Sequence, residues 1–120
     1  WATWCAPCVA ELPELHAIYA KHGRRRGRRL EILSVSVDAD PQKVVEFRRS
    51  KDHPMPWLNT VLTPAESTAL FEALGMPGRT QVPFYALVDE RGMIVRATPD
   101  LHVSALGAEL DELLGPASPR

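Results

Sequence analysis

The sequence has few cysteines, almost no net charge and no long apolar run, and each of these argues against a class of protein. It has only two cysteines among 120 residues, and its formal net charge at pH 7 is -1. Two cysteines are too few for the disulfide framework of a small stapled domain. The near-zero charge argues against a general attraction to nucleic acid or to an anionic membrane, so no nucleic-acid partner is expected. No apolar run approaches the roughly 18 residues that a membrane-spanning helix requires.

The composition does supply enough apolar material for one core. Hydrophobic residues make up 45% of the chain, and a chain of this size and composition is expected to bury a single core. We see no internal repeat and no linker. The sequence therefore predicts one domain over residues 1–115 and a short flexible tail over residues 116–120.

Both cysteines lie in the opening stretch, Trp1-Ala2-Thr3-Trp4-Cys5-Ala6-Pro7-Cys8. Apolar residues recur behind it at a spacing of three to four, which predicts a helix to about His22. Cys5 and Cys8 would lie one turn apart at the start of that helix, close enough to form a disulfide. The partial positive charge of a helix N-terminus favours a thiolate at Cys5. The pattern indicates a redox dithiol.

Together with the following Val9-Ala10-Glu11-Leu12-Pro13, this stretch resembles the active site of the thioredoxin superfamily. The resemblance is closest to the TlpA/ResA-like thiol-disulfide oxidoreductases, which carry W-x-x-W-C-x-P-C-x-x-E-x-P. It implies an α/β thioredoxin-like fold, with a central β-sheet flanked by helices. In that fold a buried central strand runs into the cysteine turn, and only its last residues could be Trp1 to Thr3. We therefore expect an N-terminally truncated domain, with a gap at the centre of the sheet unless that strand is supplied from elsewhere.

The rest of the sequence predicts strands alternating with helices, as in an α/β fold. Strands are expected at 30–37, 58–62, 85–88 and 93–97, with a hairpin turn at 90–92. Helices are expected at 41–50, 64–74 and 103–114, from N-capping residues, prolines at first helical positions and closing glycines. The arginine-rich connector 24–29 is expected to be a solvated loop, with phosphate or polyanion binding as the alternative.

The resemblance and the helix geometry together assign roles to three residues. Cys5 is expected to attack a substrate disulfide and form a mixed disulfide, which Cys8 then resolves. Glu11 lies one turn beyond Cys8 on the same helix face, and we expect it to act as the base for the Cys8 thiol. The alternative is that Glu11 is an ordinary solvated helix residue near the positive end of the helix dipole.

Four further residues are expected to contact substrate. Trp4 would form part of the rim of the site, and Pro7 lies inside the dithiol loop. The resemblance implies that Val82-Pro83 is a cis peptide whose backbone faces the substrate chain. Phe84 and Tyr85 depart from the family, in which threonines usually follow that proline, so the choice of substrate stays open.

The resemblance implies an enzyme that reduces protein disulfides, apocytochrome c among them, with electrons from a separate upstream dithiol donor. No cofactor is implied. Relatives of this type commonly work outside the cytoplasm, which implies a periplasmic or otherwise extracytoplasmic location and is compatible with a membrane anchor upstream of the sequence.

Three alternatives stay open at this stage. The same chemistry would serve an oxidant or an isomerase, since the direction depends on the reduction potential. The two cysteines would also serve a metal-binding module, although none of the four histidines has a paired ligand spacing with them and no metal site is predicted. The third alternative is an interaction domain with vestigial chemistry.

Overall fold

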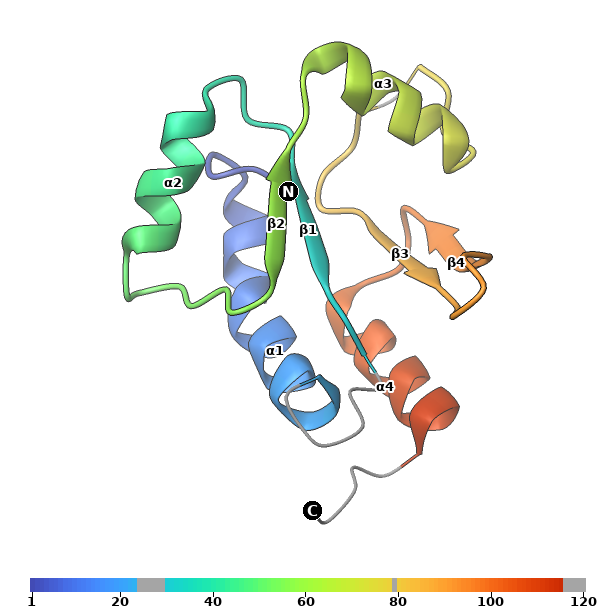
Figure 1. Ribbon diagram of the computed structural model, residues 1–120. Coiled ribbons are helices and arrows are strands. Elements are labelled where there is room, and N and C mark those ends of the chain that lie inside the picture. The colour runs from blue at the N-terminus through green and yellow to red at the C-terminus, as the bar shows by residue number, and fades with distance from the viewer. Residues whose placement is uncertain (24–29, 79, 116–120) are drawn as a thin grey trace.

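Helices and strands alternate along the chain in the computed structural model, which describes residues 1–23, 30–78 and 80–115 (Figure 1). The elements are α1 (Ala6–His22), β1 (Leu33–Ser36), α2 (Pro41–Arg49), β2 (Leu58–Val61), α3 (Pro64–Ala73), β3 (Tyr85–Val88), β4 (Ile94–Thr98) and α4 (Val103–Leu114). The predicted α/β order is confirmed. The connector 24–29 and the tail 116–120 lie outside the described residues.

Two of the helices begin with the capping chemistry that their sequences predict. At α2, the Asp40 side chain accepts a hydrogen bond from the Gln42 backbone N at 3.0 Å. At α3, Thr63 Oγ1 accepts from the Glu66 N at 3.2 Å, and Glu66 accepts from the Thr63 N at 2.8 Å. These bonds satisfy backbone donors that have no partner within the helix. The positions of both helix starts are therefore encoded locally.

The strands are arranged as expected for a sheet that is interrupted at its centre. The described strands form two separate sheets of two strands each, with β1 parallel to β2 and β3 antiparallel to β4. The strand expected at 30–37 is shorter than predicted, since β1 pairs with β2 only from Leu33 to Ser36. On its other edge, β1 is bonded by Trp1, which donates to the Val35 oxygen at 3.0 Å and accepts from the Val37 N at 2.9 Å.

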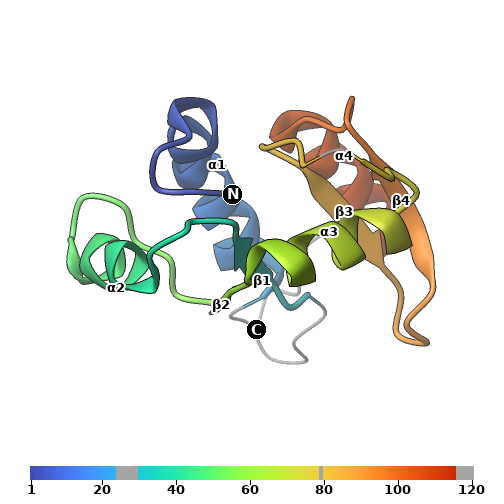
Figure 2. The ribbon, with the colours of Figure 1, turned by 90° about the horizontal axis from the view of Figure 1, so that it is seen from above.

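An apolar groove of about 790 Å³ lies between the two sheets. Residues of β1 and β3 line it, together with side chains of α1, α3 and α4. Seen from above, the β1–β2 pair and the β3–β4 hairpin stand apart (Figure 2). The gap predicted at the centre of the sheet is therefore present as this groove. Cys8 and Pro83 both line it, so it reaches the region of the dithiol.

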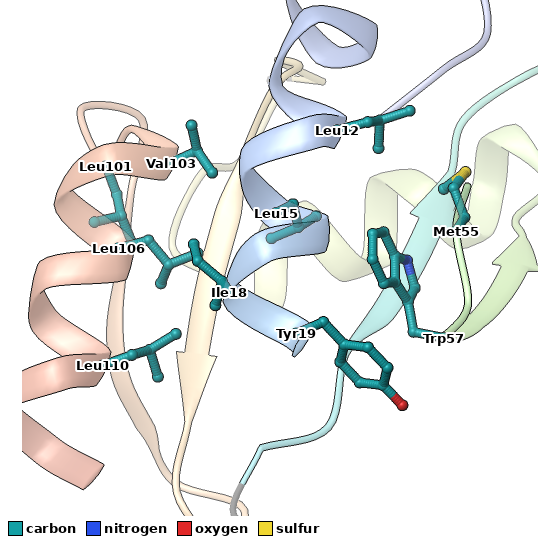
Figure 3. Close-up of a cluster of buried hydrophobic side chains, with 10 residues drawn as sticks. All are labelled: Leu12, Leu15, Ile18, Tyr19, Met55, Trp57, Leu101, Val103, Leu106 and Leu110. Carbon is teal, nitrogen blue, oxygen red and sulfur yellow. The ribbon is translucent and has the colours of Figure 1, made fainter. Parts of the chain in front are cut away.

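The main hydrophobic core lies on both sides of α1 (Figure 3). Residues of α4 pack against one side, and the segment before β2 packs against the other. The buried members of this core are Leu12, Leu15, Ile18, Tyr19, Met55, Trp57, Leu101, Val103, Leu106 and Leu110. The packing holds α1 firmly along its length, and α1 is the helix that carries the two cysteines.

A polar contact joins the far end of α1 to α4. The buried His22 places its Nε2 2.9 Å from Asp111 Oδ1, and the same oxygen accepts from Lys21 Nζ at 2.8 Å. His22 therefore has a structural partner at the end of the helix opposite to the cysteines.

Candidate active site

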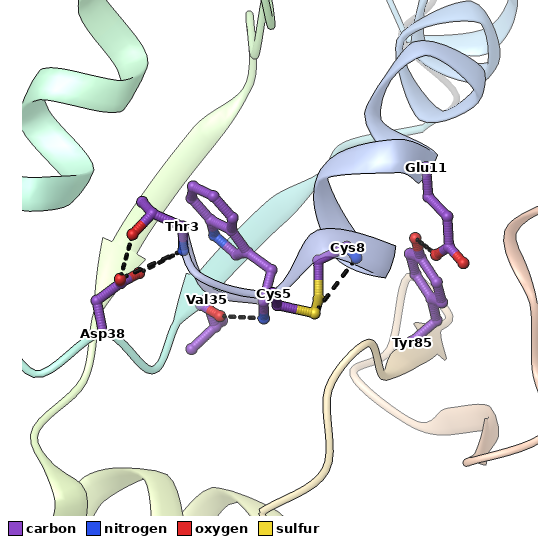
Figure 4. The surroundings of a disulfide bond; sticks show 8 residues. Thr3, Cys5, Cys8, Glu11, Val35, Asp38 and Tyr85 are labelled. Atoms are coloured by element: carbon purple, nitrogen blue, oxygen red, sulfur yellow. Dashed lines mark hydrogen bonds between the residues drawn. A yellow bond between two sulfur atoms is a disulfide. The ribbon is translucent and has the colours of Figure 1, made fainter.

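Cys5 and Cys8 form a disulfide at the N-terminus of α1, with their Cα atoms 5.3 Å apart (Figure 4). Cys5 is the N-cap residue, and its sulfur accepts a hydrogen bond from the Cys8 backbone N at 3.3 Å. Pro7 lies in the first turn, where a missing N–H costs no helical bond. The predicted pairing of the two cysteines is confirmed. The backbone donor and the helix dipole both favour negative charge at Cys5 Sγ once the disulfide is reduced.

The two sulfurs differ little in exposure in this oxidised form. Cys5 is 5% exposed and Cys8 is 4% exposed, so burial does not separate an outer attacking residue from an inner resolving one. They pack in a small apolar cluster with Ala2, and Val82 lies against this cluster. The roles assigned to Cys5 and Cys8 therefore rest on their places in the helix, at the N-cap and one turn further in.

Asp38 anchors the loop that leads into the dithiol. Its carboxylate accepts hydrogen bonds from the Thr3 backbone N at 3.0 Å and from Thr3 Oγ1 at 2.6 Å (Figure 4). It also accepts one from Ser36 Oγ at 2.6 Å. Burial alone would raise the pKa of Asp38, but the bonds from Ser36 and Thr3 outweigh it and hold the pKa below its ordinary value. The carboxylate therefore stays ionised and fixes the loop two residues before Cys5.

Thr3 and Asp38 support the site but were not among the site residues predicted from the sequence. A signal was present, because Asp38 follows directly on the predicted strand that ends at Val37. The carboxyl end of a strand in an α/β sheet is where polar groups gather around a site. What could not be foreseen was that the loop carrying Thr3 would lie beside that particular strand end.

The Val82-Pro83 peptide is cis, as the resemblance implied. Val82 packs against the cluster that contains Cys5 and Cys8, and Pro83 lines the groove beside Cys8. The Val82-Pro83 peptide and the two cysteines are 74 or more positions apart in the sequence, and the fold brings them to the same place. The next two residues, Phe84 and Tyr85, continue along the groove, and the Phe84 ring packs edge-on against Phe71 of α3.

Glu11 accepts a hydrogen bond from Tyr85, one of the two residues at which this sequence departs from the resembled family. The Tyr85 hydroxyl donates a hydrogen bond to Glu11 Oε1 at 2.6 Å (Figure 4). Burial, this hydrogen bond and the nearby charges of Glu11 and Glu14 raise the pKa of Tyr85, so its hydroxyl stays protonated at neutral pH. Glu11 is half-buried and accepts a hydrogen bond from a side chain of β3, rather than being a simple solvated helix residue.

The three tryptophans lie in different environments. Trp4 is 66% exposed next to Cys5, as expected for a residue on the rim. Trp1 is half-buried, with its ring 5.2 Å from that of Phe47 and its Nε1 bonded to Asn59. Trp57 belongs to the main core.

The described part of the chain holds neither a cluster of metal-ligating side chains nor a helix able to span a membrane. No group of three or more His, Cys, Asp and Glu side chains in residues 1–23, 30–78 and 80–115 is placed to hold a metal ion. Nor does any helix in these ranges have the length and apolarity needed to cross a membrane.

Comparison with known proteins gives similarities in sequence and in structure. The chain is 43% identical over 47 residues to the thiol-disulfide oxidoreductase ResA of Oceanobacillus iheyensis, covering 39% of this chain and 23% of that protein. The chain therefore spans about a quarter of the length of this relative.

Solved structures match over nearly the whole chain. One is a DsbE-type thiol:disulfide interchange protein from Chlorobium tepidum, with a TM-score of 0.71, 19% identity and coverage of 96% of this chain and 76% of that one. Another is an exposed lipoprotein thioredoxin of Streptococcus pneumoniae, with a TM-score of 0.63, 24% identity and coverage of 93% and 79%. At these identities the matches establish the fold, which is thioredoxin-like as predicted. A family model described as thioredoxin-like matches residues 1–94, and the chain belongs to this thioredoxin-like family.

Proposed function

We propose that this protein is a thiol-disulfide oxidoreductase that reduces disulfides in other proteins through Cys5 and Cys8. The observation that carries the proposal is the Cys5–Cys8 disulfide at the N-terminus of α1, beside the cis Val82-Pro83 peptide. A dithiol in this position can alternate between a reduced and an oxidised form without rearranging the fold, because its two Cα atoms are already 5.3 Å apart. The ResA relative, whose name describes the same activity, supports the proposal.

The reaction proceeds in two exchanges. The Cys5 thiolate attacks one sulfur of the substrate disulfide, forming a mixed disulfide and releasing the other substrate sulfur as a thiolate, which takes up a proton. Cys8 then loses its proton to Glu11 and attacks Cys5 Sγ. The bond between Cys5 and the substrate breaks, and the second substrate sulfur leaves. The substrate gains two electrons, and the protein is left with the Cys5–Cys8 disulfide.

Completing the cycle requires an external source of electrons. We propose that a separate dithiol protein reduces the Cys5–Cys8 disulfide, by the same exchange in reverse. Substrate proteins would lie across Trp4, Pro7 and the Val82-Pro83 backbone, with an extended segment bonded to the Val82 peptide groups. By likeness to the family we propose that this activity lies outside the cytoplasm, with a disulfide of apocytochrome c as one candidate substrate.

The direction of electron flow is tested by equilibrating the protein with glutathione buffers and measuring the fraction of Cys5–Cys8 disulfide. We expect a potential close to that of thioredoxin, about −270 mV, and catalysis of insulin reduction above the rate with dithiothreitol alone. A potential near that of the oxidant DsbA, about −120 mV, would reverse the proposed direction and favour the alternative of an oxidant. If Cys5 and Cys8 show no reversible redox couple, the remaining alternative is an interaction domain with vestigial chemistry.

Trp4 provides a test of the proposed substrate surface. We expect Trp4→Ala to raise the KM for a protein disulfide several-fold and to change the free energy of unfolding by no more than about 0.5 kcal/mol, because the side chain is 66% exposed. Insulin reduction and urea denaturation measure the two effects. An unchanged KM would remove Trp4 from the substrate-binding surface.

A further inference from the structure

Tyr85 is the only residue in the described part of the chain that donates a hydrogen bond to the Glu11 carboxylate, and it does so from the first position of β3. The bond to Glu11 Oε1 is 2.6 Å long, a short distance typical of a hydroxyl bonded to a charged carboxylate. Among the described residues, no hydrogen-bond donor contacts the second oxygen of Glu11, Oε2. One oxygen is thus held in place while the other is available to accept a proton.

The position of Tyr85 couples this contact to the substrate site. Tyr85 begins β3, two residues after the cis Val82-Pro83 peptide, and its ring lines the groove beside Cys8. Glu11 follows Cys8 by three residues on α1, which places the two side chains on neighbouring parts of one helix face. The hydroxyl of Tyr85 therefore connects the strand that follows the cis peptide to the helix that carries both cysteines (Figure 4).

We propose that Tyr85 is a positioning residue for Glu11: its hydroxyl holds the carboxylate with Oε2 free to take the proton of Cys8 during resolution of the mixed disulfide. This inference rests on the proposed function. In the step concerned, the Cys8 S–H bond breaks and its proton passes to Glu11 Oε2. The Cys8 thiolate then forms a bond to Cys5 Sγ, the bond between Cys5 and the substrate sulfur breaks, and that sulfur leaves with the electron pair as a thiolate, which takes up a proton. Tyr85 keeps its own proton throughout, in line with the raised pKa of its hydroxyl.

The role accounts for the residue type at this position. The tyrosine side chain reaches from β3 to Glu11 on α1, which a threonine at this position would be too short to do. A phenylalanine would fill the same volume but would leave the carboxylate without its donor. A carboxylate free to rotate loses part of the advantage of a positioned base, since general base catalysis depends on hydrogen-bond reach in the reacting geometry.

The test is Tyr85→Phe, which removes only the hydroxyl. The reduced protein is mixed with a disulfide substrate in a stopped-flow instrument, and the appearance and decay of the mixed disulfide are followed separately. We expect the decay to slow by about tenfold, as for loss of one hydrogen bond to a charged group, and the attack by Cys5 to stay within about twofold of the wild-type rate. In steady state, kcat should fall, while kcat/KM, which reports the attack by Cys5, should change by no more than about twofold.

Two controls separate positioning from a general effect on the fold. Tyr19→Phe removes a hydroxyl on the other side of the core, where Tyr19 bonds Glu31, and it should leave both steps unchanged. In a Glu11→Gln background, Tyr85→Phe should have no further effect on the decay, because the base that it positions is already absent.

The possible results are distinct. If Tyr85→Phe resolves the mixed disulfide at the wild-type rate, or slows it by the same factor with Glu11→Gln as without it, Tyr85 does not position Glu11 and this inference is wrong. If the wild-type protein reduces no disulfide, the proposed function fails first and the inference fails with it.

Discussion

We expect Cys5→Ser to abolish disulfide reduction and Cys8→Ser to stop the reaction one step later. Without Cys5 no thiolate is present at the N-cap of α1, so insulin reduction should fall to the rate with dithiothreitol alone. Without Cys8 the first exchange is intact but the mixed disulfide has no resolving thiol. The Cys8→Ser protein should therefore accumulate covalently bound substrate, visible on a non-reducing gel and lost on addition of reductant.

The same pair of variants distinguishes the roles of the two sulfurs, which their exposure in the oxidised form does not. Serine is close in volume to cysteine, so neither variant should alter the packing around Ala2 and Val82 beyond the loss of the disulfide itself. The reduced wild-type protein is the appropriate reference for stability. If Cys5→Ser trapped substrate and Cys8→Ser did not, the assignment of attacking and resolving residues would have to be exchanged.

Asp38→Ala should cause the largest loss of stability among polar substitutions near the site. It removes the acceptor for Thr3 N, Thr3 Oγ1 and Ser36 Oγ in a place where Asp38 is only 4% exposed. We expect the free energy of unfolding to fall by about 3 kcal/mol, because hydrogen bonds to a charged group are lost and buried donors are left unpaired. Urea denaturation measures this, with the exposed Asp52→Ala as a control expected to change it by less than about 0.5 kcal/mol.

The pH dependence of stability provides an independent test of the same carboxylate. The pKa of Asp38 is lowered in the folded protein from an ordinary value of 3.8. Its contribution is therefore fully present above that value and is lost as the pH falls through the lower folded-state pKa. Asp38→Asn cannot titrate, so it should lack this part of the acid destabilisation. Equal losses in the wild type and in Asp38→Asn below pH 4 would contradict the assignment.

The local features of the fold were readable from the sequence because they depend on neighbouring residues. The capping box of Thr63 and Glu66, the cap at Asp40 and the glycine that ends α4 each involve contacts within a few positions. The Cys5–Cys8 pairing is of the same kind, since a helical turn brings residues three apart together. The length of β1 was predicted less accurately. The length of a strand depends on what pairs with it, and the partner of β1 is 25 residues away in the sequence.

By itself the sequence determined the α/β order of elements, the place of the dithiol at a helix N-terminus and the candidate base Glu11. Only the tertiary structure decided which groups surround them. Asp38 meets Thr3 across 35 positions, and Tyr85 meets Glu11 across 74. The division of the strands into two sheets with a groove between them was decided at the same level. The physical reason is that side-chain periodicity and capping are properties of short segments, whereas a hydrogen bond between distant segments depends on how the whole chain packs.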